Sequence, residues 1–279
     1  MRGERPGRRG VRVGWLLGGV TTGAAATVAA VAFTVIPGPT LPSADPTTTG
    51  ARTLSGQELL WAAAALAESQ PASSGTYWHV TRLSDADVER YPWNQSAEWW
   101  IASNGDMYVL EGSGVVRYPE ALYVARQPMT LAEVEQLPTD EAALLAWITD
   151  SVPSLEETPD PGLYIALELS HLLWAVPAPP AVRAAAFRAL AGLGNVTNLG
   201  EQDGHWVVRI SLAWVPPADR FPGGVLPVGI GEWTMIIDPT TSRLVGYATY
   251  EGSAECIAEW TDDLPQIVRE GPRQDGGVG

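Results

Sequence analysis

Large apolar side chains occupy every second position of residues 205–214, with His205, Val207, Arg209, Ser211 and Ala213 between them. This period of two is typical of a strand that buries one face of a sheet. Other segments rich in β-branched and aromatic residues are 76–83, 97–103, 106–111, 232–238 and 243–250, with a weaker segment at 115–124 that Pro119 interrupts. Asn104-Gly105 and Pro239–Ser242 have the composition of hairpin turns. We therefore predict antiparallel pairing across both turns.

Helical periodicity appears first at residues 56–68 and then in the middle of the chain, from about 130 to 193. Thr139 is expected to cap a helix over 140–150, and Asp160 with Pro161 to begin a helix that ends at Trp174. Its expected buried stripe is Leu163, Leu167, Ser170 and Trp174. Pro180 is expected in the first turn of a third helix, which ends at Gly192 and buries Val182, Ala186, Ala189, Leu190 and Leu193. These short helices, placed between two groups of strands, predict an α+β domain with a largely antiparallel sheet that the helices cover.

An uncharged stretch extends from Val13 to Ile36, and Pro37 ends it. At about 1.5 Å per residue, a helix of this length just crosses a hydrocarbon core of about 30 Å. We expect a single membrane span at 13–36, preceded by a basic cytoplasmic segment at 1–12. The basic flank places the C-terminal bulk outside the cell. The alternative is a cleaved signal peptide and a secreted protein, since Ala30-Val31-Ala32 resembles a peptidase site.

Residues 37–52 are rich in Pro and Thr and are expected to form a linker. Residues 53–270 are then long enough for one extracytoplasmic domain, and 271–279 form a Gly-rich tail that we expect to be disordered.

The net charge of −15 is divided unevenly along the chain. Five arginines and one glutamate give residues 1–36 a balance of +4, which leaves −19 for the remainder. A nucleic-acid partner needs a basic surface, so the acidic domain excludes one. All 17 basic residues are arginines, and the absence of lysine excludes Schiff-base chemistry and the usual phosphate-binding loop.

Three segments of the sequence, taken together, resemble a known protein family. They are residues 163–169 (LYIALEL), 179–191 (PPAVRAAAFRALA) and 236–246 (IIDPTTSRLVG), which follow a basic N-terminus and one apolar span. In this order they resemble an actinobacterial family of single-pass membrane proteins of unknown function. The outer domain of that family is similar to the half-barrels of LolA-type lipoprotein carriers and of RseB-like regulators of anti-sigma factors. The resemblance covers about 55–252 and implies a curved, LolA-like half-barrel, but it brings no catalytic residues.

The residues that most often carry chemistry have no catalytic or metal-binding spacing. The histidines are His79, His171 and His205, and His171 can pair with Glu168 on an exposed helix face. The acidic residues from Glu133 to Asp160 lack the pattern of a calcium loop, so we interpret them as a solvated acidic face. The single Cys256 is expected to be a small buried residue on a strand. We therefore expect a non-enzymatic protein with no cofactor and no metal site.

Tryptophan is unusually abundant, with 12 residues against 3 phenylalanines. Either these rings fill the core of a curved sheet, or some of them line a concave face and contact an apolar ligand. The candidate ligand-binding residues are Trp78, Trp99, Trp206, Trp214 and Trp233. We expect a sensing or binding protein for a lipid, another apolar ligand or a cell-envelope partner. The alternative is a structural or interaction module whose barrel is plugged by its own helices; the oligomeric state stays open.

Overall fold

The computed structural model describes residues 53–87, 89, 95–151, 161–213, 230–249 and 252–270. All of them belong to one compact unit, Ala51–Gly279. The segments expected at 1–12, 13–36, 37–52 and 271–279, and the candidate Trp214, lie outside the described residues. Within the described residues, no helix is both long and apolar enough to cross a bilayer.

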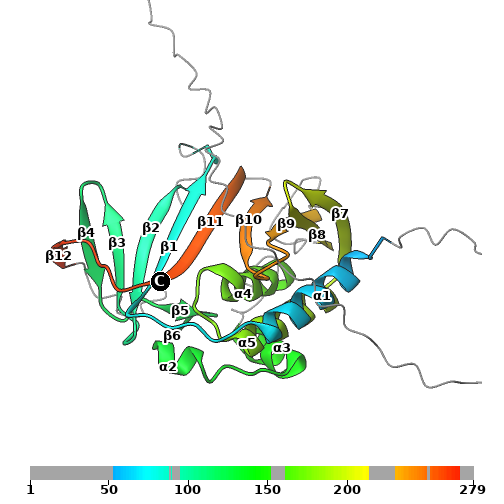
Figure 1. Ribbon diagram of the computed structural model, residues 1–279, viewed down its shortest axis with the longest axis horizontal. Helices are drawn as coiled ribbons and strands as arrows, with labels where there is room; N and C mark the ends of the chain where they lie inside the picture. Colours follow the sequence, from blue (N-terminus) through cyan, green and yellow to red (C-terminus); the bar gives the residue numbers. More distant parts are fainter. Residues whose placement is uncertain are drawn as a thin grey trace, which may run out of the picture. The chain divides into compact units, whose positions relative to one another are not determined.

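Among the described residues, ten strands form one curved sheet in the order β12-β4-β3-β2-β1-β11-β10-β9-β8-β7 (Figure 1). Their bounds are β1 Tyr77–Ser84, β2 Ala97–Ala102, β3 Met107–Glu111, β4 Gly114–Tyr118, β7 Asn195–Gln202, β8 His205–Ala213, β9 Ile230–Ile237, β10 Leu244–Thr249, β11 Gly252–Thr261 and β12 Ile267–Glu270. Neighbouring strands are antiparallel, except that β12 pairs with β4 in parallel. The predicted α+β class and the largely antiparallel sheet are therefore confirmed.

The pairing of β1 with β11 joins the early strands to the late strands. It is regular over eight residues, from Tyr77 opposite Thr261 to Ser84 opposite Ala254. The chain therefore leaves the sheet after β4, forms the helical section and returns at β7 on the opposite edge. The remaining strands, β5 (Tyr123–Val124) and β6 (Gln127–Pro128), form a separate small hairpin.

In the described part of the chain, five helices cover the concave face of the sheet (Figure 1). They are α1 Gly56–Ser69, α2 Leu131–Val134, α3 Glu141–Asp150, α4 Pro161–Trp174 and α5 Pro180–Gly192. A capping box between Ser55 and Glu58 begins α1. The predicted cap at Thr139 is wrong by one residue: the side chain of Asp140 caps α3 by accepting a hydrogen bond from the Ala143 N–H at 2.9 Å. Asp is the better cap because its carboxylate also favours the positive end of the helix dipole.

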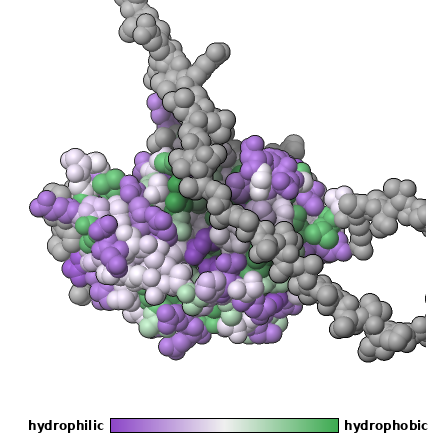
Figure 2. Space-filling view, in the orientation of Figure 1, coloured by the Kyte–Doolittle hydropathy of each residue, from purple (hydrophilic) through white to green (hydrophobic). Residues whose placement is uncertain are grey.

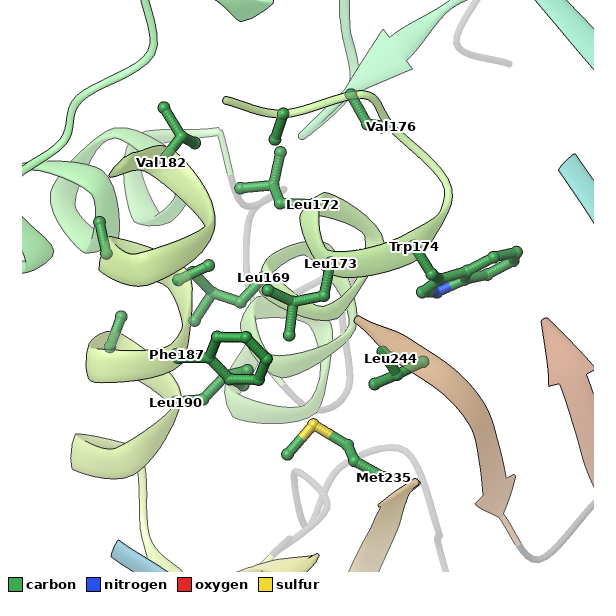
Figure 3. Packing of buried hydrophobic residues seen from close by; sticks show 14 of the residues in the cluster. Leu169, Leu172, Leu173, Trp174, Val176, Val182, Phe187, Leu190, Met235 and Leu244 are labelled. Carbon is green, nitrogen blue, oxygen red and sulfur yellow. The ribbon is translucent and has the colours of Figure 1, made fainter. Parts of the chain in front are cut away.

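Helix α4 lies between α5 and the sheet (Figure 3). Leu169 and Leu173 pack toward Phe187 and Leu190 of α5, and the hydroxyl of Ser170 lies 3.9 Å from the sulfur of Met235 on β9. The predicted stripe of α4 is thus wrong in part, because Leu163 and Leu167 are only half-buried. A helix with neighbours on two sides buries more than one stripe, and the buried residues of α4 are Ala166, Leu169, Ser170, Leu172, Leu173 and Trp174.

The concave face of the sheet is filled by these helices in the part of the chain that the structure describes. Buried residues of α1, α3, α4 and α5 form one hydrophobic cluster with inward-facing residues of β1, β2, β8, β9, β10 and β11. On β8, Val208 and Ile210 are fully buried, as the alternation predicted, but Val207 on the other face is buried too and Trp206 is only half-buried. Hydrophilic residues dominate the view in Figure 2, where apolar residues occur in small groups.

The outer face of the early strands has a small cluster of its own. Trp100, Tyr108 and Val115 are buried there, and Leu264 packs on them from the segment between β11 and β12. This crossing segment was not predicted, because its few residues have no period of their own. The weak segment at 115–124 proves to be two strands, since β4 ends at Tyr118 just before Pro119.

Gly56 allows α1 to lie directly against β7. A Cβ at Gly56 would meet the carbonyl oxygen of Val196 at 2.5 Å, whereas a Cβ at Gly192 would meet nothing within 4 Å. We predict that Gly56→Ala lowers the free energy of unfolding by about 1–3 kcal/mol, because the helix must move away from the strand. Gly192→Ala should raise it by up to about 1 kcal/mol through helix propensity. Urea unfolding measures both, and equal effects would contradict the close approach.

Candidate functional site

The structure places four of the five candidate tryptophans. Trp78 and Trp233 are buried, whereas Trp99 and Trp206 are half-buried and pack against the same hydrophobic cluster. Trp206 lies on β8 opposite Ile237 and contacts none of the other three through its ring. The candidates therefore do not form one site but separate into two aromatic groups and Trp206.

The first aromatic group lies between α4 and the sheet. Trp174 of α4 meets Trp99 of β2 edge-on at 5.8 Å and Tyr247 of β10 at 5.9 Å, and Tyr247 stacks on Trp233 of β9 at 4.7 Å. Figure 3 shows Trp174 pointing away from α5. The indole N–H groups of Trp174 and Trp233 are buried and have no hydrogen-bond partner among the residues that the structure describes. This row of rings therefore connects α4 with the early strand β2 and with the late strands β9 and β10.

The second aromatic group borders a cavity of about 250 Å³ at one end of the sheet. Trp78 of β1 lies opposite Trp260 of β11 in the strand register, and the two rings meet edge-on at 5.4 Å. Arg243, just before β10, places its guanidinium 4.8 Å from the centre of the Trp78 ring. Arg183 of α5 completes the polar lining. We call this site the arginine pocket; its other lining residues are Pro71, Ala72, Ser73, Glu135, Pro177, Ala178, Pro179 and Pro180.

Both arginines of the pocket are desolvated. Arg183 is only 6% exposed, and burial together with the charge of Arg243 lowers its pKa to about 10. Burial also lowers the pKa of Arg243. Within the described residues, neither guanidinium has an ion pair, and the Nε of Arg183 has no hydrogen-bond partner. A buried charge without an ion pair is destabilising, because no nearby opposite charge offsets its loss of hydration.

The local sequence explains how these groups converge. The proline-rich segment 177–180 fixes the turn between α4 and α5, and Pro180 begins α5 without a side-chain cap. Arg183 is therefore in the first turn of α5, next to the cavity. Arg243 is held by the turn before β10, in which Asp238 accepts hydrogen bonds from Thr240 and Thr241. The backbone carbonyl of Arg243 accepts a hydrogen bond from the Asp238 N–H at 2.9 Å.

Glu168 forms a second polar site on α4. Its carboxylate accepts a hydrogen bond from the Ala125 N–H at 3.0 Å and lies 3.8 Å from the His171 ring. Burial opposes the charged form, but His171 and the Ala125 N–H outweigh it, so the pKa of Glu168 lies below its usual value. The expectation of an exposed pair is wrong for Glu168, whose side chain is 14% exposed. Burial and the charge of Glu168 raise the pKa of the neighbouring Tyr164 to about 12.

Glu168 also stabilises an unfavourable turn. Ala125 and Arg126 both have positive φ angles, of 48° and 64°, in the two-residue turn between β5 and β6. Such a turn normally contains Asn or Gly, because other residues lose about 1–2 kcal/mol in this conformation. The hydrogen bond from Ala125 to Glu168 compensates part of that cost, so Glu168 has a structural role.

The remaining candidate residues lie apart from both sites. His79 stacks on Trp100 at 4.6 Å and pairs with Glu98 on the outer face. Cys256 is buried on β11 as predicted, and burial raises the pKa of its thiol to about 12. Across the described segments, no three His, Cys, Asp or Glu residues gather as a metal site would require.

Comparison with known proteins gives a limited result. No family model matches the chain, and no curated protein matches it. Among solved structures, it is similar to the crystal structure of lipoprotein LppX from Mycobacterium tuberculosis. The two share 13% sequence identity, the alignment covers 74% of this chain and 97% of that chain, and the TM-score is 0.28. So loose an overlap transfers no property of LppX to this chain.

Sequence reasoning missed both arginines of the pocket. Arg183 was not part of the predicted buried face of this alanine-rich helix, but at about 100° per residue it lies beside Leu190 at the edge of that face, where a charged residue is unexpected. That position was the available signal. Its significance depends on Arg243, 60 residues further on, which only the packed structure brings near.

We predict that Glu168 contributes stability above its unfolded pKa near 4.5, and that this contribution disappears as the pH falls through the lower folded value. Glu168→Gln should therefore weaken the acid-induced loss of stability. Glu168→Ala should in addition lose about 1–3 kcal/mol at pH 7, because the Ala125 N–H is left unpaired. Urea unfolding at pH 7 and pH 3.5 measures both effects. An acid response identical to that of the unchanged protein would contradict this role.

Proposed function

We propose that this chain is a non-enzymatic, membrane-anchored binding or sensing protein, whose outer α+β domain takes a small amphipathic molecule in the arginine pocket. The observation that carries the proposal is the pocket itself, in which two tryptophan rings and a proline-rich wall adjoin the guanidiniums of buried Arg183 and half-buried Arg243. Ligand sites commonly combine an apolar lining with a few polar groups of this kind.

The size of the cavity narrows the class of ligand. Pockets for drug-sized molecules have volumes of about 300–1,000 Å³. A cavity of about 250 Å³ suits a small molecule or the head of a larger amphiphile, rather than whole lipid chains. Because α4 and α5 occupy the concave face, the tails of such an amphiphile would extend beyond the pocket instead of entering the half-barrel.

The anchor and the LolA-type relationship are part of the same proposal. The uncharged stretch 13–36 after a basic segment supports a single span with the domain outside the cell. The order of the helix pair and the hairpin supports a half-barrel of the LolA type. The acidic domain supports a surface that repels nucleic acid.

A second candidate function is a protein-interaction module with a self-plugged barrel. The packing of α4 between α5 and the sheet favours it, because no ligand is then needed to fill the concave face. In-cell crosslinking of the full chain should trap an envelope protein under this alternative. Under the first proposal, the protein should instead bind a small molecule, and substitutions in the arginine pocket should abolish that binding.

Binding to the pocket can be tested with a neutral fluorescent probe, N-phenyl-1-naphthylamine, added to residues 45–279, which contain the whole compact unit. We predict that Trp260→Ala weakens probe binding by about tenfold, since it removes one aromatic wall. Trp61→Ala is the matched control, because Trp61 is 47% exposed on α1. Equal affinities of both variants and the unchanged fragment would count against the pocket.

The anchor has its own test. In native membranes washed at alkaline pH, we predict that the full chain stays in the membrane fraction and that its mass includes residues 1–36. A released protein that begins at Phe33 would instead indicate signal-peptide cleavage after Ala32.

A further inference from the structure

Within the described residues, no ion pair neutralises either arginine of the arginine pocket. Arg183 and Arg243 lie close enough for the charge of one to disfavour the charge of the other. Glu135 also lines the cavity, but no ion pair joins it to either arginine in the described part of the chain. Some other arginines of the described chain have a carboxylate partner, as Arg188 has in Glu68 at 2.6 Å and Arg117 has in Asp106 at 2.7 Å.

The first turn of α5 adds to this positive potential. Pro179 precedes the helix and no side chain caps it, so the N–H groups of Ala181 and Val182 have no cap partner. Pro179, Pro180 and Arg183 all line the cavity. The positive end of a 13-residue helix thus meets the same space as the two guanidiniums.

We propose that the arginine pocket binds a phosphate group. This inference rests on the proposed function, whose ligand it makes more specific. Two guanidinium groups present parallel N–H donors that match the oxygens of a phosphate, and the charge of about −1.5 to −2 on a phosphate monoester balances them. The phosphate would supply the partner that buried Arg183 lacks. Trp78 and Trp260 would then contact the carbon skeleton that carries the phosphate.

The phosphate could be free or part of a lipid headgroup, and one experiment separates the sources. Thermal unfolding of the full chain is followed in neutral detergent with inorganic phosphate, with glycerol 3-phosphate, or with potassium chloride at equal ionic strength. It is repeated in phosphatidylcholine nanodiscs with and without phosphatidic acid. We expect phosphate well above its Kd to raise Tm by about 5 °C relative to chloride. A larger shift with phosphatidic acid would assign the phosphate to a lipid, and a larger shift with the soluble compounds to a free metabolite.

Substitutions in the arginine pocket are expected to change phosphate binding in opposite directions, depending on the charge that is removed. Arg183→Met should raise Tm without phosphate, because it removes an unpaired buried charge, and should abolish the phosphate shift. Arg243→Met should reduce phosphate affinity at least about tenfold. Glu135→Gln should strengthen binding, since a carboxylate leaves the cavity lining. Arg188→Met, on the same helix but paired with Glu68, is the control and should keep the full phosphate shift.

The proposal is overturned if phosphate stabilises the unchanged protein no more than chloride does, or if Arg183→Met and Arg243→Met retain the shift. The proposed function is tested separately, because binding of the neutral probe is measured without any phosphate. It fails if Trp260→Ala does not weaken binding of that probe. Probe binding that depends on Trp260, combined with no phosphate shift, would keep the apolar site and reject the anion site.

Discussion

The antiparallel pairing of β1 with β11 is the contact on which the other features depend. It joins residues that are about 170–184 positions apart in sequence, and it makes one ten-stranded sheet from two groups of strands. The same register sets Trp78 opposite Trp260, while the neighbouring β10 places Arg243 over the Trp78 ring. The two aromatic walls of the arginine pocket and one of its charges are therefore consequences of this pairing. A slip of one residue in this pairing would place the two tryptophans on opposite faces of the sheet.

The curvature of the sheet and the helix pair α4–α5 stabilise each other. A sheet with a concave apolar face needs a cover, and α4 supplies it with residues that are buried around most of its circumference. Small side chains on α5 allow close packing, since Ala184, Ala185 and Ala186 are all fully buried. As a consequence, the helices already occupy the concave side of the curved sheet. The cavity lies instead at the end of the sheet, next to the turn between α4 and α5.

Local patterns in the sequence predicted the positions of helices and strands better than they predicted which strands pair. Pro180 and Gly192 correctly mark the ends of α5, and the alternation around Val208 identifies β8, because both signals depend on neighbouring residues. The parallel pairing of β12 with β4 has no local signal, since it depends on a crossing held by Leu264. The site was predictable only in part. Trp78 was a candidate for its size and its place on a strand, whereas Arg183 and Arg243 gain meaning only from their proximity and from the absence of an ion pair to either of them in the described structure.

That absence is informative because the chain is so rich in acids. With 32 acidic residues against 17 arginines, a carboxylate partner for Arg183 would be easy to provide, and Arg117 and Arg188 both have one. The acidic surface repels anions at long range, but this repulsion is screened over about 10 Å at 0.1 M salt, whereas the buried guanidiniums act at contact distance in a medium of lower dielectric constant. An anion that reaches the pocket therefore experiences the two arginines and the start of α5 more strongly than the outer charge. Such a site favours ligands whose apolar part contacts the tryptophans, because small hydrophilic anions gain nothing from the rings and still face the outer repulsion.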